Sequence, residues 1–159
     1  MHRTDALSYA NGCHAAEVEV DIETGEVRVL NYTAVQDSGV LINPMMVEGQ
    51  MHGGIVHGIG NALFEWMGYD EHAQPVTTTY ADYLLPTATE VPMMTTLTKE
   101  TPSPLNPLGV KGVGEAGTIP AAAALVSAIE DALTPFGVRI GFQPVPPARL
   151  VEMIGAARS

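Results

Sequence analysis

A run of apolar residues at every fourth position is the feature that most restricts the fold of this 159-residue chain. Asn43 followed by Pro44 is typical of a helix N-cap and a first helical residue. The apolar positions that follow at this spacing are Val47, Met51, Ile55, Ile59 and Leu63. They predict one long helix, or two abutting helices, that run to about Met67.

The same segment is rich in glycine. Gly49 and Gly53 are one helical turn apart, as are Gly54 and Gly58, and each glycine inside a helix costs up to about 1 kcal/mol relative to alanine. Two interpretations stay open at this point. Either another helix or sheet packs tightly on the glycines, or the bare backbone lets a cofactor or a substrate domain come close.

Strict alternation of apolar and acidic residues before this helix predicts a half-buried strand from Ala16. The turn at residues 23–26 then leads into a second strand, which predicts an antiparallel hairpin. The apolar residues that alternate along the two strands are Val18, Val20, Ile22, Val27, Val29 and Val35. The acidic face of the first strand is interpreted as solvent-exposed, because its carboxylates do not converge as a metal site requires.

Further elements are expected downstream of the long helix. They are a threonine-rich strand at 76–79, a strand at 93–98, a buried alanine-rich helix at 121–133, a short strand at 138–142 and a terminal helix from Pro146. The expected fold class is α+β, with an antiparallel hairpin and short strands packed against a glycine-rich helix and the buried alanine-rich helix. Residues 1–14 are expected to be a loosely ordered segment, and residues 15–159 one domain.

A glycine-rich turn that carries one carboxylate stands before the alanine-rich helix. Its glycines at 112, 114 and 117 permit unusual backbone angles and the close approach of a ligand. Thr118 and Pro120 are interpreted as the N-cap and first turn of the helix, which would place unpaired amides just after Glu115. Such a site suits an anionic cofactor or a developing negative charge, and Glu115 could act as a general base. On the residues alone, a plain strand-to-helix connection is the alternative.

Composition excludes several classes of partner. Seven basic residues against 18 acidic ones leave a net charge of -11, which argues against nucleic acid or an anionic membrane surface as a partner. Cys13 is the single cysteine, so an internal disulfide cannot form, and it is interpreted as a small buried residue. The sequence shows neither a signal peptide nor a membrane span, so a cytoplasmic location is expected.

The run from Asn106 to Thr118, NPLGVKGVGEAGT, resembles a signature near the C-terminus of molybdenum hydroxylase large subunits. This family includes xanthine dehydrogenase, aldehyde oxidoreductase and aerobic carbon monoxide dehydrogenase. Three earlier stretches are similar to the family in the same order, at 18–25, 37–60 and 82–86. The resemblance covers residues 15–150 and points most to the carbon monoxide dehydrogenase large chain.

The resemblance implies that this chain is the C-terminal, molybdopterin-binding part of a larger subunit and that Glu115 is its catalytic base. The residues that it places at the cofactor are Gly112, Val113, Gly114, Gln50, Gly53 and Gly54. The pterin would hold the molybdenum, so no metal-binding side chain is expected in this chain. Lys111 is either a further cofactor contact or a surface charge.

The resemblance also implies partners. The cofactor, expected in its cytosine dinucleotide form, would be shared with the remainder of the large subunit. An iron-sulfur small subunit and a flavin (FAD) medium subunit would carry electrons away from a small-molecule substrate. Two alternatives stay open: an aldehyde or N-heterocycle hydroxylase, and an isolated non-catalytic domain that serves only subunit interaction.

Overall fold

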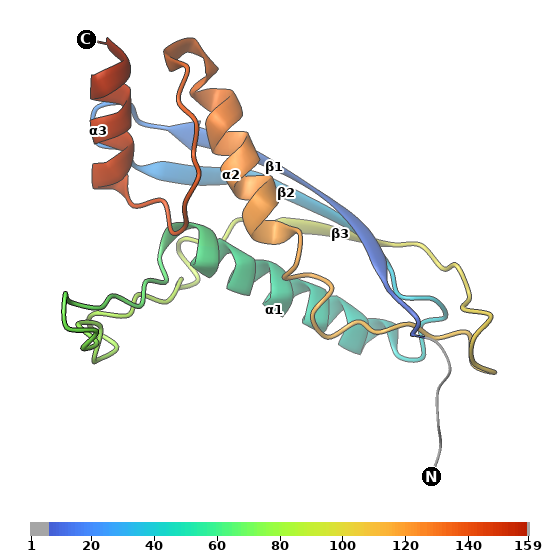
Figure 1. Cartoon of the computed structure of the whole chain (residues 1–159). Coiled ribbons are helices and arrows are strands. Elements are labelled where there is room, and N and C mark those ends of the chain that lie inside the picture. Colours follow the sequence, from blue (N-terminus) through green and yellow to red (C-terminus); the bar gives the residue numbers. More distant parts are fainter. Residues whose placement is uncertain (1–6, 159) are drawn as a thin grey trace.

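The computed structural model describes residues 7–158, which form a three-stranded sheet and three α-helices (Figure 1). In chain order, the elements are β1 (Asn11–Val20), β2 (Val27–Asp37), α1 (Pro44–Leu63), β3 (Met94–Thr98), α2 (Ala121–Ala132), the 3-10 helix η1 (Thr134–Phe136) and α3 (Pro147–Arg158). The predicted α+β class is therefore confirmed. In the part that the structure describes, no helix is both long and apolar enough to cross a membrane.

The sheet has the strand order β1-β2-β3. β1 and β2 are antiparallel, which confirms the predicted hairpin, and β3 confirms the strand expected at 93–98. β3 pairs with β2 in parallel, so the sheet is mixed and its antiparallel part is the hairpin. Parallel neighbours need a long crossover connection, and α1 lies within that connection.

A β-bulge changes which residues of β2 face the core. Glu17 pairs with Asn31 whereas Val18 pairs with Val29, so Leu30 is the extra residue on β2. Because side chains alternate along a strand, one extra residue moves every later side chain to the other face. The buried residues beyond the bulge are Tyr32, Ala34 and Gln36, while Val35 turns away from the core.

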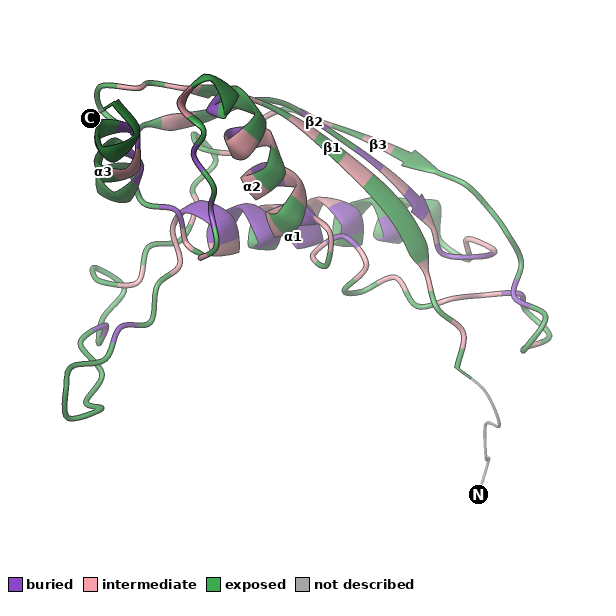
Figure 2. Cartoon of the chain, turned by 45° about the horizontal axis from the view of Figure 1, so that its top comes forward, coloured by how far each residue is buried: buried purple, intermediate pink, exposed green. Residues whose placement is uncertain are grey.

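α1 and α2 pack on the same face of the sheet, and their buried stripes are visible in Figure 2. α1 begins as predicted, because the Asn43 Oδ1 accepts a hydrogen bond from the Met46 amide at 3.2 Å. It ends at Leu63, short of the predicted Met67. The largest fully buried side chains of the core include Tyr32, Met51, Ile55, Ile59, Leu125, Ile129, Leu150 and Ile154.

α2 is buried along one stripe only. Ala121, Leu125 and Ile129 are fully buried, while Ala123 and Ser127 are exposed. The helix that was expected to be buried is therefore buried on one side and partly exposed on the other. Small alanine side chains allow α2 to lie close to its neighbours on the packed side. On the opposite side, the same small side chains offer little apolar surface against which another element could pack.

Two predicted strands are absent from the described chain. Residues 76–79 belong to a long loop between α1 and β3, where the Asp82 carboxylate accepts hydrogen bonds from the Thr78 and Thr79 amides. These local bonds compete with strand pairing. Residues 138–142 are also irregular, and the Ile140 amide donates to the Glu130 side chain at 2.6 Å instead of to a neighbouring strand.

The N-terminal part of the chain is more regular than expected. β1 begins at Asn11, so residues 11–14 are strand instead of part of a loosely ordered segment that ends at residue 14. Cys13 is exposed on this strand, which corrects its interpretation as a buried residue. Residues 1–6 lie outside the described residues.

Candidate cofactor-binding and catalytic site

The segment just before the glycine turn is hydrogen-bonded to the residues that follow β2. The Val40 amide donates to the Gly109 carbonyl at 3.0 Å, and the Lys111 amide donates to the Ser38 carbonyl at 2.9 Å. These bonds join segments that are about 70 residues apart in the sequence. They place the turn beside the C-terminal end of β2.

Asn106 closes the loop immediately before the turn. Its side-chain Nδ2 donates to the Val110 carbonyl at 2.8 Å, and its Oδ1 accepts from the Val110 amide at 3.1 Å. One side chain therefore satisfies both backbone groups of Val110. Gly109, with φ of 67°, allows the sharp bend that this closure requires.

Lys111 forms an ion pair with Asp37. Its Nζ lies 2.9 Å from the Asp37 Oδ2, and the two side chains are only 9% and 14% exposed. The Gly39 amide, Lys111 and Thr101 all donate to the Asp37 carboxylate and hold its pKa well below the usual range. Lys111 was interpreted as either a cofactor contact or a surface charge. The structure shows a third role, because the mostly buried ion pair with Asp37 fixes the position of the turn.

The far end of the turn lies directly on the backbone of α1. A Cβ on Gly117 would stand 2.8 Å from the Met51 carbonyl oxygen, and a Cβ on Gly54 would stand 2.9 Å from the Thr118 amide nitrogen. Neither distance leaves room for a side chain. Gly58 similarly leaves room for Ala121 at the start of α2. For Gly54 and Gly58, the structure therefore shows tight packing.

Among the described residues, the first amides of the turn have no partner. Hydrogen bonds within the turn start at Ala116, whose amide donates to the Val113 carbonyl at 3.3 Å. In the described part of the chain, the amides of Gly112, Val113 and Gly114 donate to nothing. A Cβ on Gly112 would meet no atom within 4 Å. Unpaired amides on an open backbone are a suitable site for an anionic group.

Thr118 does not cap α2 as predicted. Residues 114–120 form a series of turns, and α2 starts only at Ala121, with Pro120 at the cap position and no side-chain cap bond. The Thr118 amide instead donates to the Glu115 carbonyl at 3.0 Å. The free amides therefore precede Glu115 and do not belong to the first turn of the helix.

Gln50 of α1 lies next to the turn, and Gly53 follows it on the exposed surface of the same helix. A Cβ on Gly114 would stand 3.9 Å from the Gln50 Oε1, so the two residues are neighbours. Both Gln50 and Gly53 are exposed, and a Cβ on Gly53 or on Gly49 would meet nothing within 4 Å. The structure thus brings Gln50 and the turn together, while Gly53 leaves bare helix surface with no atom of the described chain near its Cβ position.

Glu115 stands at the wall of a cavity of about 460 Å³. The other walls are the glycine turn, the segment around Ser8 and Tyr9, and Gln36 of β2. The Glu115 side chain is exposed, and among the described residues its carboxylate has no hydrogen-bond or ion-pair partner. A free carboxylate beside unpaired amides can bind, orient or deprotonate a ligand in this cavity.

Gln36 is a residue of this cavity that the sequence analysis missed. It is 1% exposed, and in the described chain its Oε1 has no hydrogen-bond partner. An unsatisfied buried polar group costs about 1–3 kcal/mol. Counting alternate residues from Val27 places Gln36 on the outer face, so only recognition of the bulge at Leu30 could have revealed it.

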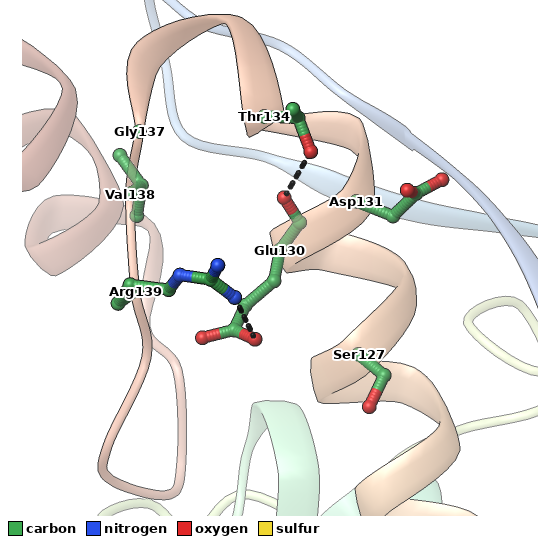
Figure 3. A pocket seen from close by; sticks show the side chains of 7 residues that line it. All are labelled: Ser127, Glu130, Asp131, Thr134, Gly137, Val138 and Arg139. Atoms are coloured by element: carbon green, nitrogen blue, oxygen red, sulfur yellow. Dashed lines mark hydrogen bonds and ion pairs between the residues drawn. The ribbon is translucent and has the colours of Figure 1, made fainter.

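A second cavity, of about 340 Å³, lies at the end of α2 (Figure 3). Its central side chain is Glu130, which accepts a hydrogen bond from the Ile140 amide and lies 3.7 Å from the Arg139 Nη1. Thr134 donates to the Glu130 carbonyl at 3.4 Å. Because the Glu130 carboxylate is engaged in holding the chain after α2, we interpret this cavity as structural.

The architecture holds a turn with unpaired amides against a glycine-rich helix, an arrangement that suits an anionic cofactor. Residues 2–92 match the family model described as the molybdopterin cofactor-binding domain. The chain belongs to this family. The matched part includes Gln50 and Gly53 of α1, and the glycine turn lies beyond it.

Relatives among known proteins agree with this assignment. The chain is 46% identical to the nicotine 6-hydroxylase large subunit of Paenarthrobacter nicotinovorans, over 94% of this chain and 18% of that protein. It is 38% identical to the carbon monoxide dehydrogenase large chain of Hydrogenophaga pseudoflava, over 83% of this chain and 16% of that protein. The chain thus spans less than a fifth of the length of these relatives.

A solved structure shows the same fold. Quinoline 2-oxidoreductase from Pseudomonas putida 86 superposes with a TM-score of 0.89 and 49% sequence identity, over 92% of this chain and 19% of that chain. The resemblance to molybdenum hydroxylase large subunits inferred from the sequence is therefore confirmed.

Proposed function

We propose that this chain supplies the catalytic base and part of the cofactor site of a molybdenum hydroxylase large subunit. The observation that carries the proposal is the position of Glu115, whose free carboxylate follows directly on the unpaired amides of Gly112, Val113 and Gly114. The glycine turn therefore carries both a candidate base, Glu115, and backbone amides that can bind an anion. The family assignment indicates which cofactor such a turn would meet.

The residues present fit a molybdopterin cofactor. Its phosphate and pterin groups offer acceptors for the three unpaired amides and for the Gln50 side chain, while Gly53 leaves the surface of α1 open for close approach. Gly54 would act indirectly, by seating the turn on α1. When bound, the cofactor supplies the two-electron oxidation that hydroxylation requires. We expect its cytosine dinucleotide form, shared with the remainder of the large subunit.

Glu115 acts in this proposal as a general base. Its carboxylate accepts a proton from the oxygen nucleophile and releases it to solvent through the cavity, a contribution that is typically about 10²–10⁴-fold in rate. The neighbouring amides offset negative charge near the reacting group. Electrons would leave through an iron-sulfur subunit and a flavin subunit in a cytoplasmic complex.

Aromatic N-heterocycles are the substrate class that we favour. The relatives with the higher identities in these comparisons are named for hydroxylating nicotine and oxidising quinoline. The cavity of about 460 Å³ is within the usual range of small-molecule sites. A carbon monoxide dehydrogenase-like activity is the second candidate, supported by the 38% identity to that large chain.

The proposal is tested on the complex formed with the rest of the large subunit and its electron-transfer partners. We expect molybdenum and pterin in the purified complex, and Glu115→Gln should abolish turnover while the content of both stays unchanged. Glu71→Gln, at an exposed glutamate outside the cavity, is the matched control and should keep full activity.

Three outcomes would count against this function. A complex without molybdenum would exclude the cofactor site. Turnover by Glu115→Gln would exclude this glutamate as the base. A loaded wild-type complex that oxidises no heterocycle, aldehyde or carbon monoxide would favour a domain that serves only subunit interaction.

A further inference from the structure

One polar side chain of the Glu115 cavity has no role in the function proposed above. Gln36 lies on the inner face of β2, two residues after Ala34 and four after Tyr32, where the other side chains belong to the apolar core. It is 1% exposed, and in the described part of the chain its Oε1 has no partner. Ser8, another polar residue of this cavity, already has a partner, because its hydroxyl donates to the Ser103 hydroxyl at 2.9 Å.

The opposite strand leaves space for the Gln36 amide. Gly12 of β1 is its pairing partner, and a Cβ at Gly12 would stand 2.9 Å from the Gln36 Oε1. A side chain at position 12 would therefore clash with the side-chain amide of Gln36. A half-turn of the amide exchanges its oxygen and nitrogen, so the group can present either a donor or an acceptor to the cavity.

This chemistry matches a particular ligand. An aromatic N-heterocycle has an acceptor nitrogen in its ring, and the amide N–H can donate to it. Hydroxylation at the adjacent carbon, followed by proton transfer from oxygen to nitrogen, yields a cyclic amide with an N–H donor beside a C=O acceptor. A glutamine amide can pair with both groups. Carbon monoxide and simple aldehydes lack this combination.

We propose that Gln36 is a specificity-determining residue that hydrogen-bonds the ring nitrogen of an aromatic N-heterocycle in the Glu115 cavity. The inference rests on the function proposed above and extends it to the choice of substrate. Burial strengthens the discrimination, because a ligand without the ring nitrogen leaves the buried Gln36 amide unsatisfied.

Binding to the assembled complex tests this role without turnover. In the dithionite-reduced complex, which does not oxidise its substrate, the dissociation constants of quinoline and of its carbon analogue naphthalene are measured by titration. We expect wild-type protein to prefer quinoline about 5- to 10-fold, the usual value of one neutral hydrogen bond. Gln36→Leu and the straight-chain Gln36→Met should reduce this ratio to about one.

Gln74→Leu is the matched control, because Gln74 is an exposed glutamine in the loop after α1 and lies outside the cavity. It should keep the wild-type preference. The melting temperature of Gln36→Met should not fall, since the change removes an unsatisfied polar group from an apolar face.

Three results would overturn the inference. These are an unchanged quinoline preference in both Gln36 variants, the absence of a preference in wild-type protein, and failure of both variants to fold, which would show that the fold itself requires the amide. The proposed function fails by different measurements, namely molybdenum content and the effect of Glu115→Gln on turnover. The two conclusions are therefore separable.

Discussion

The ammonium nitrogen of Lys111 lies 2.9 Å from the Oδ2 of Asp37, and this ion pair joins the glycine turn to the end of β2. Asp37 is the direct neighbour of Gln36, whose side chain lines the cavity of Glu115. Two consecutive residues of β2 therefore serve the site in different ways. One fixes the turn that carries the base, and the other forms a wall of the cavity that the base faces.

Asp37→Asn should destabilise the purified chain. The amide keeps an oxygen for the Gly39 N–H but leaves the mostly buried Lys111 ammonium without its counter-charge. Thermal unfolding followed by circular dichroism at pH 7 measures the effect. Asp70→Asn is the control, because Asp70 also caps backbone amides but has no ion-pair partner in the described chain, and we expect the smaller loss for it.

The same ion pair predicts a dependence on pH. The pKa of Asp37 is lowered in the folded chain, so its stabilisation is complete above the ordinary aspartate value of about 4 and is lost as the pH falls toward the lower folded value. Urea unfolding between pH 3 and pH 7 should therefore show a smaller acid loss in Asp37→Asn than in wild type. Parallel curves would contradict this assignment.

Gly117→Ala should lower the free energy of unfolding by about 1–3 kcal/mol, the usual effect of overpacking. The added Cβ would stand 2.8 Å from the Met51 carbonyl oxygen, and backbone cannot move aside as a flexible side chain can. Gly141→Ala is the control, because a Cβ there meets nothing within 4 Å. Equal stability of the two variants in urea titrations would show that the turn is not seated on α1.

Gly112→Val should separate cofactor binding from folding. A Cβ at this exposed position meets no atom within 4 Å, so we expect the unfolding free energy to stay within about 0.5 kcal/mol of wild type. In the assembled complex, the valine would occupy space beside the unpaired amides, and molybdenum content should fall several-fold. Gly141→Val should leave the metal content unchanged, and a full metal content in Gly112→Val would place the cofactor elsewhere.

Asn106→Ala should destabilise the chain by about 1–3 kcal/mol, because both backbone groups of Val110 lose their partner. Asn31→Ala is a useful comparison. Asn31 donates to the Glu17 carboxylate on the exposed face of the hairpin, where water replaces a lost bond, so its effect should be below about 0.5 kcal/mol. A smaller loss for Asn106→Ala than for Asn31→Ala would exclude the loop closure.

Local patterns were enough for much of the fold. The alternation of Val18 and Val20 predicted the hairpin, and Asn43 followed by Pro44 predicted the start of α1, because each depends on neighbours within one turn or one strand. Predictions failed where distant or competing partners act. Asp82 binds the threonines expected in a strand, and the parallel pairing of β3 depends on the crossover through α1.

The candidate site divides in the same way. Glu115 and the glycines of the turn are recognisable in the sequence, because a motif is a property of adjacent residues. The placement of Gln36 beside Glu115 depends on the bulge at Leu30, and the seating of Gly117 on Gly54 depends on contact between segments 63 residues apart. Register and backbone contact of this kind arise only when the whole chain packs, because their energy comes from partners that the local sequence does not contain.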